Sequence, residues 1–230
     1  MPEVESELYK LITLSGPDTA DFLQGQLTQD VTRLTRAGSL LSAWCNAKGR
    51  VIAVVRLLAL DGATGLVVPA AMAERLLQRL LMYRLRAKVD IALCDDDIDA
   101  RLSDDETDPA ALVRAGIPHI DEQNSETFTP HMLNLDRLDA ISFDKGCYTG
   151  QEVVARTEHL GHSKRRMMRY RASADGIRAG NKLSDGERNV GTVVNVAGRD
   201  LLAVTPVELH DRPLRSGDIV VTPMGLPYPM

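Results

Sequence analysis

Aromatic residues are scarce in this sequence. They make up 4% of the 230 residues, with a single tryptophan, so the core must be built mainly from aliphatic side chains. The apolar and charged fractions, 44% and 26%, are ordinary for a globular protein. Disordered, collagen-like and coiled-coil classes are therefore excluded as descriptions of the whole chain, and the length allows one large domain or two small ones.

Cysteine is also rare, and the three residues Cys45, Cys94 and Cys147 lie far apart without a CxxC pair. This odd number argues against a disulfide framework and against a four-thiolate metal site within one chain. A reducing compartment fits this usage best. The two histidines of an HxxH spacing, His159 and His162, lack a third ligand, so we expect no metal site.

The chain has neither an excess of positive charge nor a long apolar run. Its 27 basic and 32 acidic residues give a formal charge of −5, which argues against a general nucleic-acid binder. The acidic N-terminus is unlike a secretory signal, and no apolar run approaches the roughly 18 residues that a membrane span needs. We expect a cytoplasmic protein that contacts neither a membrane nor nucleic acid directly.

The first 95 residues show an alternation of strand and helix patterns. Apolar periodicity predicts strands at 7–14, 38–47, 50–60 and 87–93, a short extra strand at 65–68, and helices after residue 17 and over 70–85. The order β-α-β-β-α-β is typical of a split βαβ fold, in which two helices cover one face of an antiparallel sheet. We therefore predict an α+β protein whose residues 1–95 form a ferredoxin-like domain.

The remainder divides at about residue 162. Residues 95–108 carry eight acids and one base and predict a solvated linker, because a calcium loop would need a glycine and a ligand spacing that are missing. We assign residues 96–162 to the first domain, with a short helix at 109–115. Short apolar stretches between turn residues over 163–230 predict a small β-barrel or sandwich, with strands at 167–172, 190–196, 201–204 and 219–221.

The segment 141–156 contains the most distinctive chemistry. Thr149 and Glu152 have the spacing of a capping box before a helical run. Cys147 would then precede a helix N-terminus, two residues after Lys145, and both features favour a thiolate. The pattern predicts a reactive Cys147, and a buried structural cysteine beside a glycine-rich turn is the alternative.

Three other segments stand out, and each has an explanation that requires no function. Residues 24–31 are polar for a helix end and either line a pocket or simply end the helix. Residues 44–50 form a hairpin turn that needs no function. Residues 156–171 carry a net charge of +5, which indicates either a solvated strand edge or an anion site beside Cys147.

The octapeptide Lys-Gly-Cys-Tyr-Thr-Gly-Gln-Glu at 145–152 resembles the signature of the YgfZ family. These folate-binding proteins are similar to the T-protein, the aminomethyltransferase of the glycine cleavage system. Supporting blocks lie at 23–31, 45–49, 116–121 and 226–228. The resemblance implies a GcvT/YgfZ-like domain before the barrel, a tetrahydrofolate or a derivative as cofactor, and a role in iron–sulfur cluster assembly or repair. Its implied partners are iron–sulfur proteins or their assembly machinery, including radical enzymes that modify tRNA.

The resemblance assigns the reactive positions to Cys147 and Lys145. A folate presents a pterin, a flat ring system and an anionic tail, which require amide or carboxylate, aromatic and cationic groups. The signature and the segments above offer ten candidates to hold it: Gln24, Gln26, Trp44, Asn46, Gly146, Tyr148, Gly150, Gln151, Glu152 and Arg156.

Two departures from the family pattern matter. The T-protein has a catalytic aspartate after the first hairpin strand, whereas residues 46–56 contain no acid, so we do not expect aminomethyl transfer. The region between residues 93 and 116 is also shorter than in typical members. The alternatives that remain are a folate-dependent one-carbon transferase, a thiol-exchange enzyme, and a thiol-dependent interaction module without folate.

Overall fold

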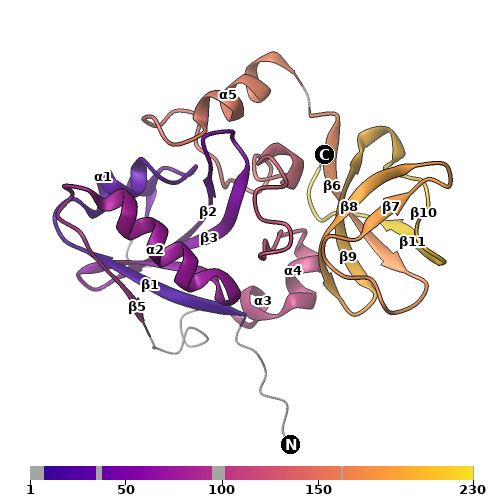
Figure 1. The fold of residues 1–230 in the computed structure, drawn as a ribbon, viewed down its shortest axis with the longest axis horizontal. Coiled ribbons are helices and arrows are strands. Elements are labelled where there is room, and N and C mark those ends of the chain that lie inside the picture. Colours follow the sequence, from indigo (N-terminus) through magenta and orange to yellow (C-terminus); the bar gives the residue numbers. More distant parts are fainter. Residues whose placement is uncertain (1–7, 35–37, 95–101, 162, 230) are drawn as a thin grey trace, which may run out of the picture.

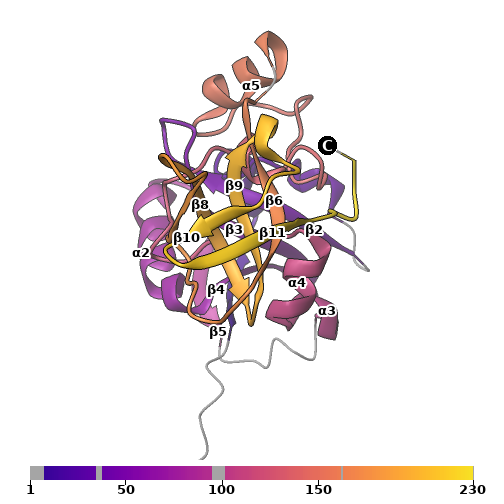
Figure 2. The same ribbon diagram turned by 90° about the vertical axis from the view of Figure 1, so that its right-hand side faces the viewer.

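The computed structural model describes residues 8–34, 38–94, 102–161 and 163–229. It confirms the α+β fold: a five-stranded antiparallel sheet is followed by a closed six-stranded barrel (Figure 1). Figure 2 shows the barrel from its outer side, with the sheet behind it. No helix within the described ranges has the length and apolar character to span a membrane.

The first sheet has the strand order β2-β3-β4-β1-β5. Its strands are β1 (Tyr9–Ser15), β2 (Ser39–Cys45), β3 (Val51–Leu60), β4 (Ala63–Pro69) and β5 (Asp90–Cys94). All the strands expected in this region are present. The strand expected as a short addition is β4, which has seven residues and pairs with both β3 and β1, so it lies in the middle of the sheet.

Two helices cover one face of this sheet, as the split βαβ pattern predicts. They are α1 (Thr19–Gln24) and α2 (Ala73–Arg84), the latter entered through a 3₁₀ turn, η2 (Ala70–Met72). Leu23 of α1 and Leu76 of α2 are fully buried with Ile12 and Leu57 of the sheet in one apolar cluster. Burial of these aliphatic side chains is the main force that holds the helices to the sheet.

The opposite face is covered by the middle segment of the chain, which also contacts the barrel. One cluster joins Val54 of the sheet, Phe128 and Leu135 of the middle segment, and Met167 and Leu202 of the barrel. The regular elements of the middle segment are α3 (Asp104–Thr107), α4 (Pro109–Ala115), η3 (His131–Leu133) and α5 (Gln151–Leu160). A further 3₁₀ turn, η1 (Val31–Arg33), lies earlier in the chain, between α1 and β2. The middle segment therefore packs between the sheet and the barrel and connects them.

The described part of the acidic stretch is not a solvated linker. Leu102 is buried, and Glu106 on α3 forms a 2.7 Å ion pair with Arg56 of β3. This part of the expectation is wrong because an apolar residue and a charge partner across the sheet anchor the segment, while residues 95–101 lie outside the described ranges. The expected helix at 109–115 is confirmed as α4, with the Asp108 carboxylate accepting from the backbone N–H of Ala110 and Ala111.

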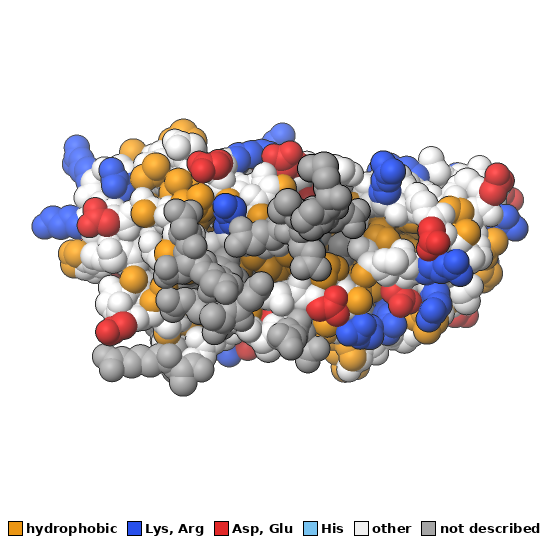
Figure 3. Space-filling view, turned by 90° about the horizontal axis from the view of Figure 1, so that it is seen from below, with side chains coloured by type: hydrophobic (Ala, Val, Ile, Leu, Met, Phe, Trp, Pro, Cys, Tyr) orange, Lys and Arg blue, Asp and Glu red, His pale blue; other side chains and the backbone are white. Residues whose placement is uncertain are grey.

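The C-terminal barrel closes in the order β10-β11-β6-β9-β8-β7. Its elements are β6 (Arg165–Ala172), β7 (Lys182–Ser184), β8 (Asn189–Ala197), β9 (Asp200–Pro206), η4 (Val207–Leu209), β10 (Leu214–Ser216) and β11 (Ile219–Met224). The four expected strands are confirmed, and the two three-residue strands β7 and β10 were not predicted. On the face seen in Figure 3, acidic and basic side chains are interspersed over the barrel end.

Candidate functional site

The signature segment, residues 145–152, is docked on the end of α1. The Lys145 ammonium donates to three backbone carbonyl oxygens, those of Gln24 (2.8 Å), Leu27 (2.7 Å) and Gln29 (3.0 Å). The Thr149 N–H donates to the Gly25 carbonyl at 3.2 Å. An ammonium has three donors, so all of them are satisfied by backbone here.

The burial of Lys145 has an electrostatic consequence. Burial lowers the pKa of Lys145 from 10.5 to about 8, although the nearby negative charge of Asp30 acts to raise it. The ammonium also lies 5.1 Å from the centre of the Tyr148 ring, whose face attracts a cation. The structure thus gives Lys145 the geometry of a positioning residue, which fixes the signature segment to residues 24–29.

The hairpin turn between β2 and β3 contacts the start of α5. Gly150 has a φ of +85°, and a Cβ there would collide with the carbonyl oxygen of Asn46. Across the same contact, a Cβ on Gly49 (φ +66°) would lie 2.8 Å from the Cβ of Val153. Only glycine allows these two backbones to approach so closely.

The capping box expected at this helix start is wrong. Gly150, in the left-handed conformation, is the N-cap of α5, and no side chain among the described residues caps the helix. The helix therefore begins one residue later than Thr149 would require, because contact with the hairpin turn imposes the conformation of Gly150. The Gln151 side chain instead accepts from the Tyr148 N–H at 3.3 Å.

Cys147 lies on the open side of the signature segment. It is exposed, and no atom of the described residues lies within 4 Å of a Cβ placed on neighbouring Gly146. The next residue, Tyr148, is buried and anchors the segment. The alternative that Cys147 is a buried structural cysteine is therefore wrong. Cys45 is the buried one: burial raises the pKa of its thiol to about 12 and leaves it inert at neutral pH.

Two of the polar folate-binding candidates are occupied by local hydrogen bonds. Gln24 donates to the Asp30 carboxylate (2.8 Å) and accepts from the Val31 N–H (2.9 Å). Asn46 closes the hairpin turn by accepting from the N–H of Lys48 (2.9 Å) and of Arg50 (3.0 Å). Both side chains shape the loops on which the signature segment rests.

Gln26 differs from these two residues. Its side-chain oxygen is buried and has no hydrogen-bond partner among the residues that the structure describes. A buried carbonyl without a partner is costly, and native structures satisfy nearly all such atoms. Gln26 follows directly after Gly25, which the signature segment contacts, so a buried acceptor without a described partner lies next in sequence to this contact.

The only tryptophan is not at the surface. Trp44 is 1% exposed and packs in the cluster beneath α1 and α2. Its ring contacts the Arg79 guanidinium (5.7 Å) and the Tyr83 ring (6.4 Å). The structure thus places it in the core, whereas Glu152 and Arg156 are exposed on α5.

For Arg165 and Arg166, neither interpretation of the basic segment 156–171 holds. β6 pairs with β9 and β11, so it is not a sheet edge. The Arg166 guanidinium donates to both oxygens of Asp136, at 2.7 and 2.9 Å, and the Arg165 guanidinium donates to the Val190 carbonyl. Arg166 thus ties the barrel to the loop that carries Asp136, and Arg165 joins β6 to β8 within the barrel, so neither is available to an anion beside Cys147.

A carboxylate that the sequence did not reveal lies at the hairpin turn. Glu126 accepts from the Asn46 amide at 2.9 Å and from the Arg79 guanidinium at 3.4 Å. Its φ of +61° is unusual for a residue other than glycine, and its N–H donates to the Val51 carbonyl (2.7 Å). Eighty residues separate it from Asn46, so no local pattern could have found it.

This chain is similar in sequence to curated proteins and in fold to a solved structure. No protein-family model matches the chain. The tRNA-modifying protein YgfZ of Klebsiella pneumoniae (strain 342) is 31% identical over 81% of this chain and 78% of its own length. This chain belongs to the YgfZ family. An uncharacterized protein of Haemophilus influenzae is 30% identical, over 84% of this chain and 83% of its own.

Length and fold agree with this assignment. The alignment with the Klebsiella protein spans 254 positions, more than the 230 residues of this chain, so the relative has extra residues inside the matched region. Aminomethyltransferase T of the glycine cleavage system from Bartonella henselae matches with a TM-score of 0.68 at 15% identity, over 95% of this chain and 83% of that structure. The T-protein-like fold expected for the YgfZ-family chain is confirmed.

Proposed function

We propose that this YgfZ-family chain binds a reduced folate, tetrahydrofolate or a derivative, and assists iron–sulfur cluster assembly or repair in the cytoplasm. A relative bears the name of a tRNA-modifying protein. We infer that this chain contributes to tRNA modification through cluster-dependent enzymes, because its net charge of −5 does not favour direct contact with RNA. The observation that carries the proposal is an exposed thiol, Cys147, on a signature segment held in place by Lys145.

The residues around the signature segment fit a folate in specific respects. The unpartnered oxygen of Gln26 can accept from an N–H group of a pterin. The space around Gly146 is open, so a flat ring can approach the backbone there. Gln26 and Gly146 are therefore the two positions through which we test binding.

The exposed thiol has a limited repertoire by itself. A cluster needs several ligands, and Cys147 supplies one, so the others must come from a partner protein. Cys147 therefore contacts a cluster, a folate or a partner thiol during transfer, and a cluster is not stored on this chain alone. The cell-based test is replacement of Cys147 by Ser, which should lower the activity of cluster-dependent enzymes while the purified variant keeps its thermal stability.

The direct test is calorimetric titration of the reduced full chain with a stable reduced folate. We expect saturable one-site binding by the unmodified protein. Gly146→Leu fills open space without a positive φ, so it should fold normally and weaken binding at least tenfold. The matched control is Gly161→Leu, at the far end of α5, where a Cβ also meets open space.

The outcomes separate the alternatives. Equal binding by both glycine variants would remove the open face near Cys147 from the proposal. If neither the unmodified protein nor the variants bind folate up to millimolar ligand, but Cys147 is still required in cells, the chain is a thiol-dependent interaction module without folate.

Glu126 favours a second candidate, the folate-dependent one-carbon transferase. It places a carboxylate at the hairpin turn, where residues 46–56 supply none, although Arg75 and Arg79 offset its charge. This function requires turnover of an aminomethyl donor in the presence of tetrahydrofolate. Turnover should be lost in Glu126→Gln, which keeps the size of the side chain.

A further inference from the structure

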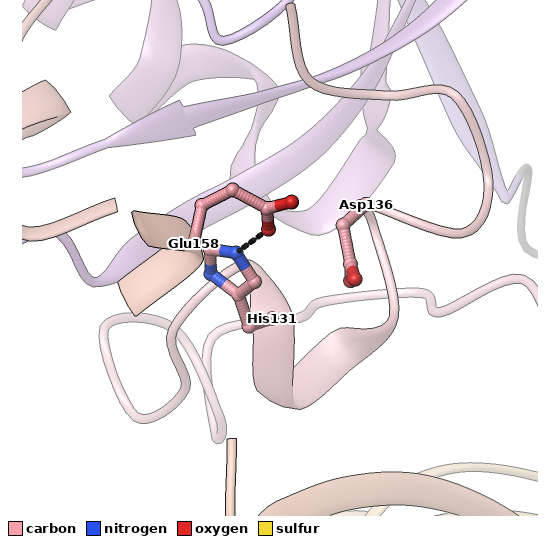
Figure 4. Close-up of side chains that lie close together, drawn as sticks. All are labelled: His131, Asp136 and Glu158. Carbon is pink, nitrogen blue, oxygen red and sulfur yellow. Dashed lines mark hydrogen bonds and ion pairs between the residues drawn. The ribbon is translucent and has the colours of Figure 1, made fainter. Parts of the chain in front are cut away.

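Three side chains that the proposed function does not use converge beside α5. They are His131 on η3, Asp136 in the following loop and Glu158 near the end of α5 (Figure 4). Each can offer one ligand atom, and these atoms all lie within 4.8 Å of one another. In the part of the chain that the structure describes, this is the one group of three or more such residues.

The surroundings of the group combine burial with an opening to solvent. The side chains of His131 and Asp136 are 2% and 8% exposed, whereas that of Glu158 is 42% exposed. The imidazole Nε2 contacts the Glu158 carboxylate at 3.0 Å, and Nδ1 has no hydrogen-bond partner among the described residues. The ring therefore has a single polar interaction, which lies on the side facing the two carboxylates.

The donor set selects a class of metal. One imidazole nitrogen and two carboxylate oxygens suit a borderline divalent cation such as Zn²⁺, because calcium and magnesium prefer oxygen ligands alone. Three protein ligands leave a fourth position to water, and the exposed side of Glu158 provides a path for entry. A neutral imidazole can ligate through Nε2 if its proton moves to Nδ1.

Two cations oppose such a site. Arg166 donates to both oxygens of Asp136, and the Arg137 guanidinium lies 3.6 Å from the same carboxylate. A carboxylate in a metal site is commonly held by a second hydrogen-bonding group, which is the part Arg166 can play. The positive charge of both arginines lowers the expected affinity of the site for a cation.

We propose that His131, Asp136 and Glu158 bind a divalent cation of the Zn²⁺ class. Bound metal would join α5 to the loop that Arg166 ties to the barrel. Since the signature segment includes the first two residues of α5, the metal would restrain the end of the helix opposite Cys147. This site is independent of folate binding and lies outside the signature segment.

The test is calorimetric titration of Zn²⁺ into the chelator-treated full chain in the Cys147→Ser background, because an exposed thiol also binds zinc. We expect one site per chain and a rise in the melting temperature on binding. Glu158→Gln keeps the size of the side chain and an acceptor for His131, and should weaken binding at least tenfold. The control His159→Gln, on the exposed neighbour in the same helix, should bind as the parent does.

A further variant separates metal binding from a simple hydrogen bond. Arg137→Ala removes an opposing charge at an exposed position and should tighten Zn²⁺ binding several-fold. Co²⁺ in place of Zn²⁺ should give a visible spectrum without a thiolate charge-transfer band. Absence of saturable binding up to millimolar Zn²⁺, or equal affinity in Glu158→Gln and its parent, would overturn the proposal.

Discussion

The unpartnered oxygen of Gln26 leads to a prediction in which stability and binding change in opposite directions. Replacing Gln26 by Met keeps a flexible side chain of similar size and removes the buried carbonyl. A buried acceptor without a partner costs about 1–3 kcal/mol. Gln26 is only half-buried, so we take the low end and expect the free energy of unfolding to rise by about 1 kcal/mol.

That gain in stability has a measurable size. For a chain of this length, 1 kcal/mol corresponds to a rise of about 2–4 °C in the melting temperature. Folate affinity should fall about tenfold, equivalent to about 1.4 kcal/mol, because the ligand loses an acceptor and its donor is left unpaired. Denaturant titration and scanning calorimetry measure the first effect, and folate titration measures the second.

The control is Gln123→Met, at an exposed glutamine, which should change neither quantity. If Gln26→Met lowers the free energy of unfolding, the oxygen has a stabilising partner and the reasoning is wrong. If the variant is more stable but binds folate with unchanged affinity, the buried oxygen of Gln26 does destabilise the protein, but Gln26 does not contact the ligand.

Three further predictions concern the contacts that hold the site together. Lys145→Met should lower the free energy of unfolding at pH 7 by roughly 1–2 kcal/mol, since three carbonyl groups lose a charged donor. Because burial lowers the pKa of Lys145 from 10.5 to about 8, the unfolded chain binds more protons between these pH values. The stability of the unmodified protein relative to Lys145→Met should therefore rise from pH 8 to 10.5, as measured by denaturant titration. A fall over this range would contradict the lowered pKa of Lys145. Gly150→Ala should cost about 2 kcal/mol or more, measured by the same titration, because a left-handed conformation and a collision with the Asn46 carbonyl add together; a cost below 0.5 kcal/mol would be unexpected. Arg166→Ala should cost about 3 kcal/mol by leaving Asp136 buried without its bidentate partner, and the double variant Arg166→Met with Asp136→Leu should recover most of this loss.

The sequence predicted the elements whose signal is local. The spacing of Leu76 and Leu80 on α2 follows from burial of one helical face, and β3 is a nearly continuous apolar run because it is buried on both faces. Both patterns are visible within a short window of the sequence. The order of strands within the sheet was harder to predict from the sequence. β4 was expected as a short addition because its pattern is brief, yet its pairing with both β1 and β3 makes it central.

The candidate site was predictable as a set of segments but not as a set of contacts. The sequence analysis singled out residues 24–31, 44–50 and 145–152, and the structure brings all three together. The roles within them depend on partners distant in sequence. Nothing near Lys145 indicates that it donates to carbonyl groups over a hundred residues away, and nothing near Arg166 identifies Asp136 as its partner.

Trp44 shows why residue type alone misassigns a role. A lone tryptophan next to the family-like block 45–49 suggests a stacking surface for a flat ligand. In β2, however, successive side chains point to opposite faces of the sheet. Ala43 and Cys45 enter the cluster shared with the barrel, so Trp44 must face α1 and α2, where it is buried. The alternation could have predicted this placement once its neighbours were known to be buried.

The same alternation explains how the position of Cys147 depends on both halves of the protein. β2 is buried on both faces, so the hairpin turn that follows it is fixed by the helical layer and by the middle segment together. Gly150 rests on that turn, and Lys145 ties the other end of the signature segment to α1. At the far end of α5, Glu158 contacts His131, whose backbone carbonyl accepts from Arg166 of the barrel. The helix that follows Cys147 is therefore held by the sheet at its start and through the barrel at its end. A ligand or partner that changes either contact should also change the position of the Cys147 thiol.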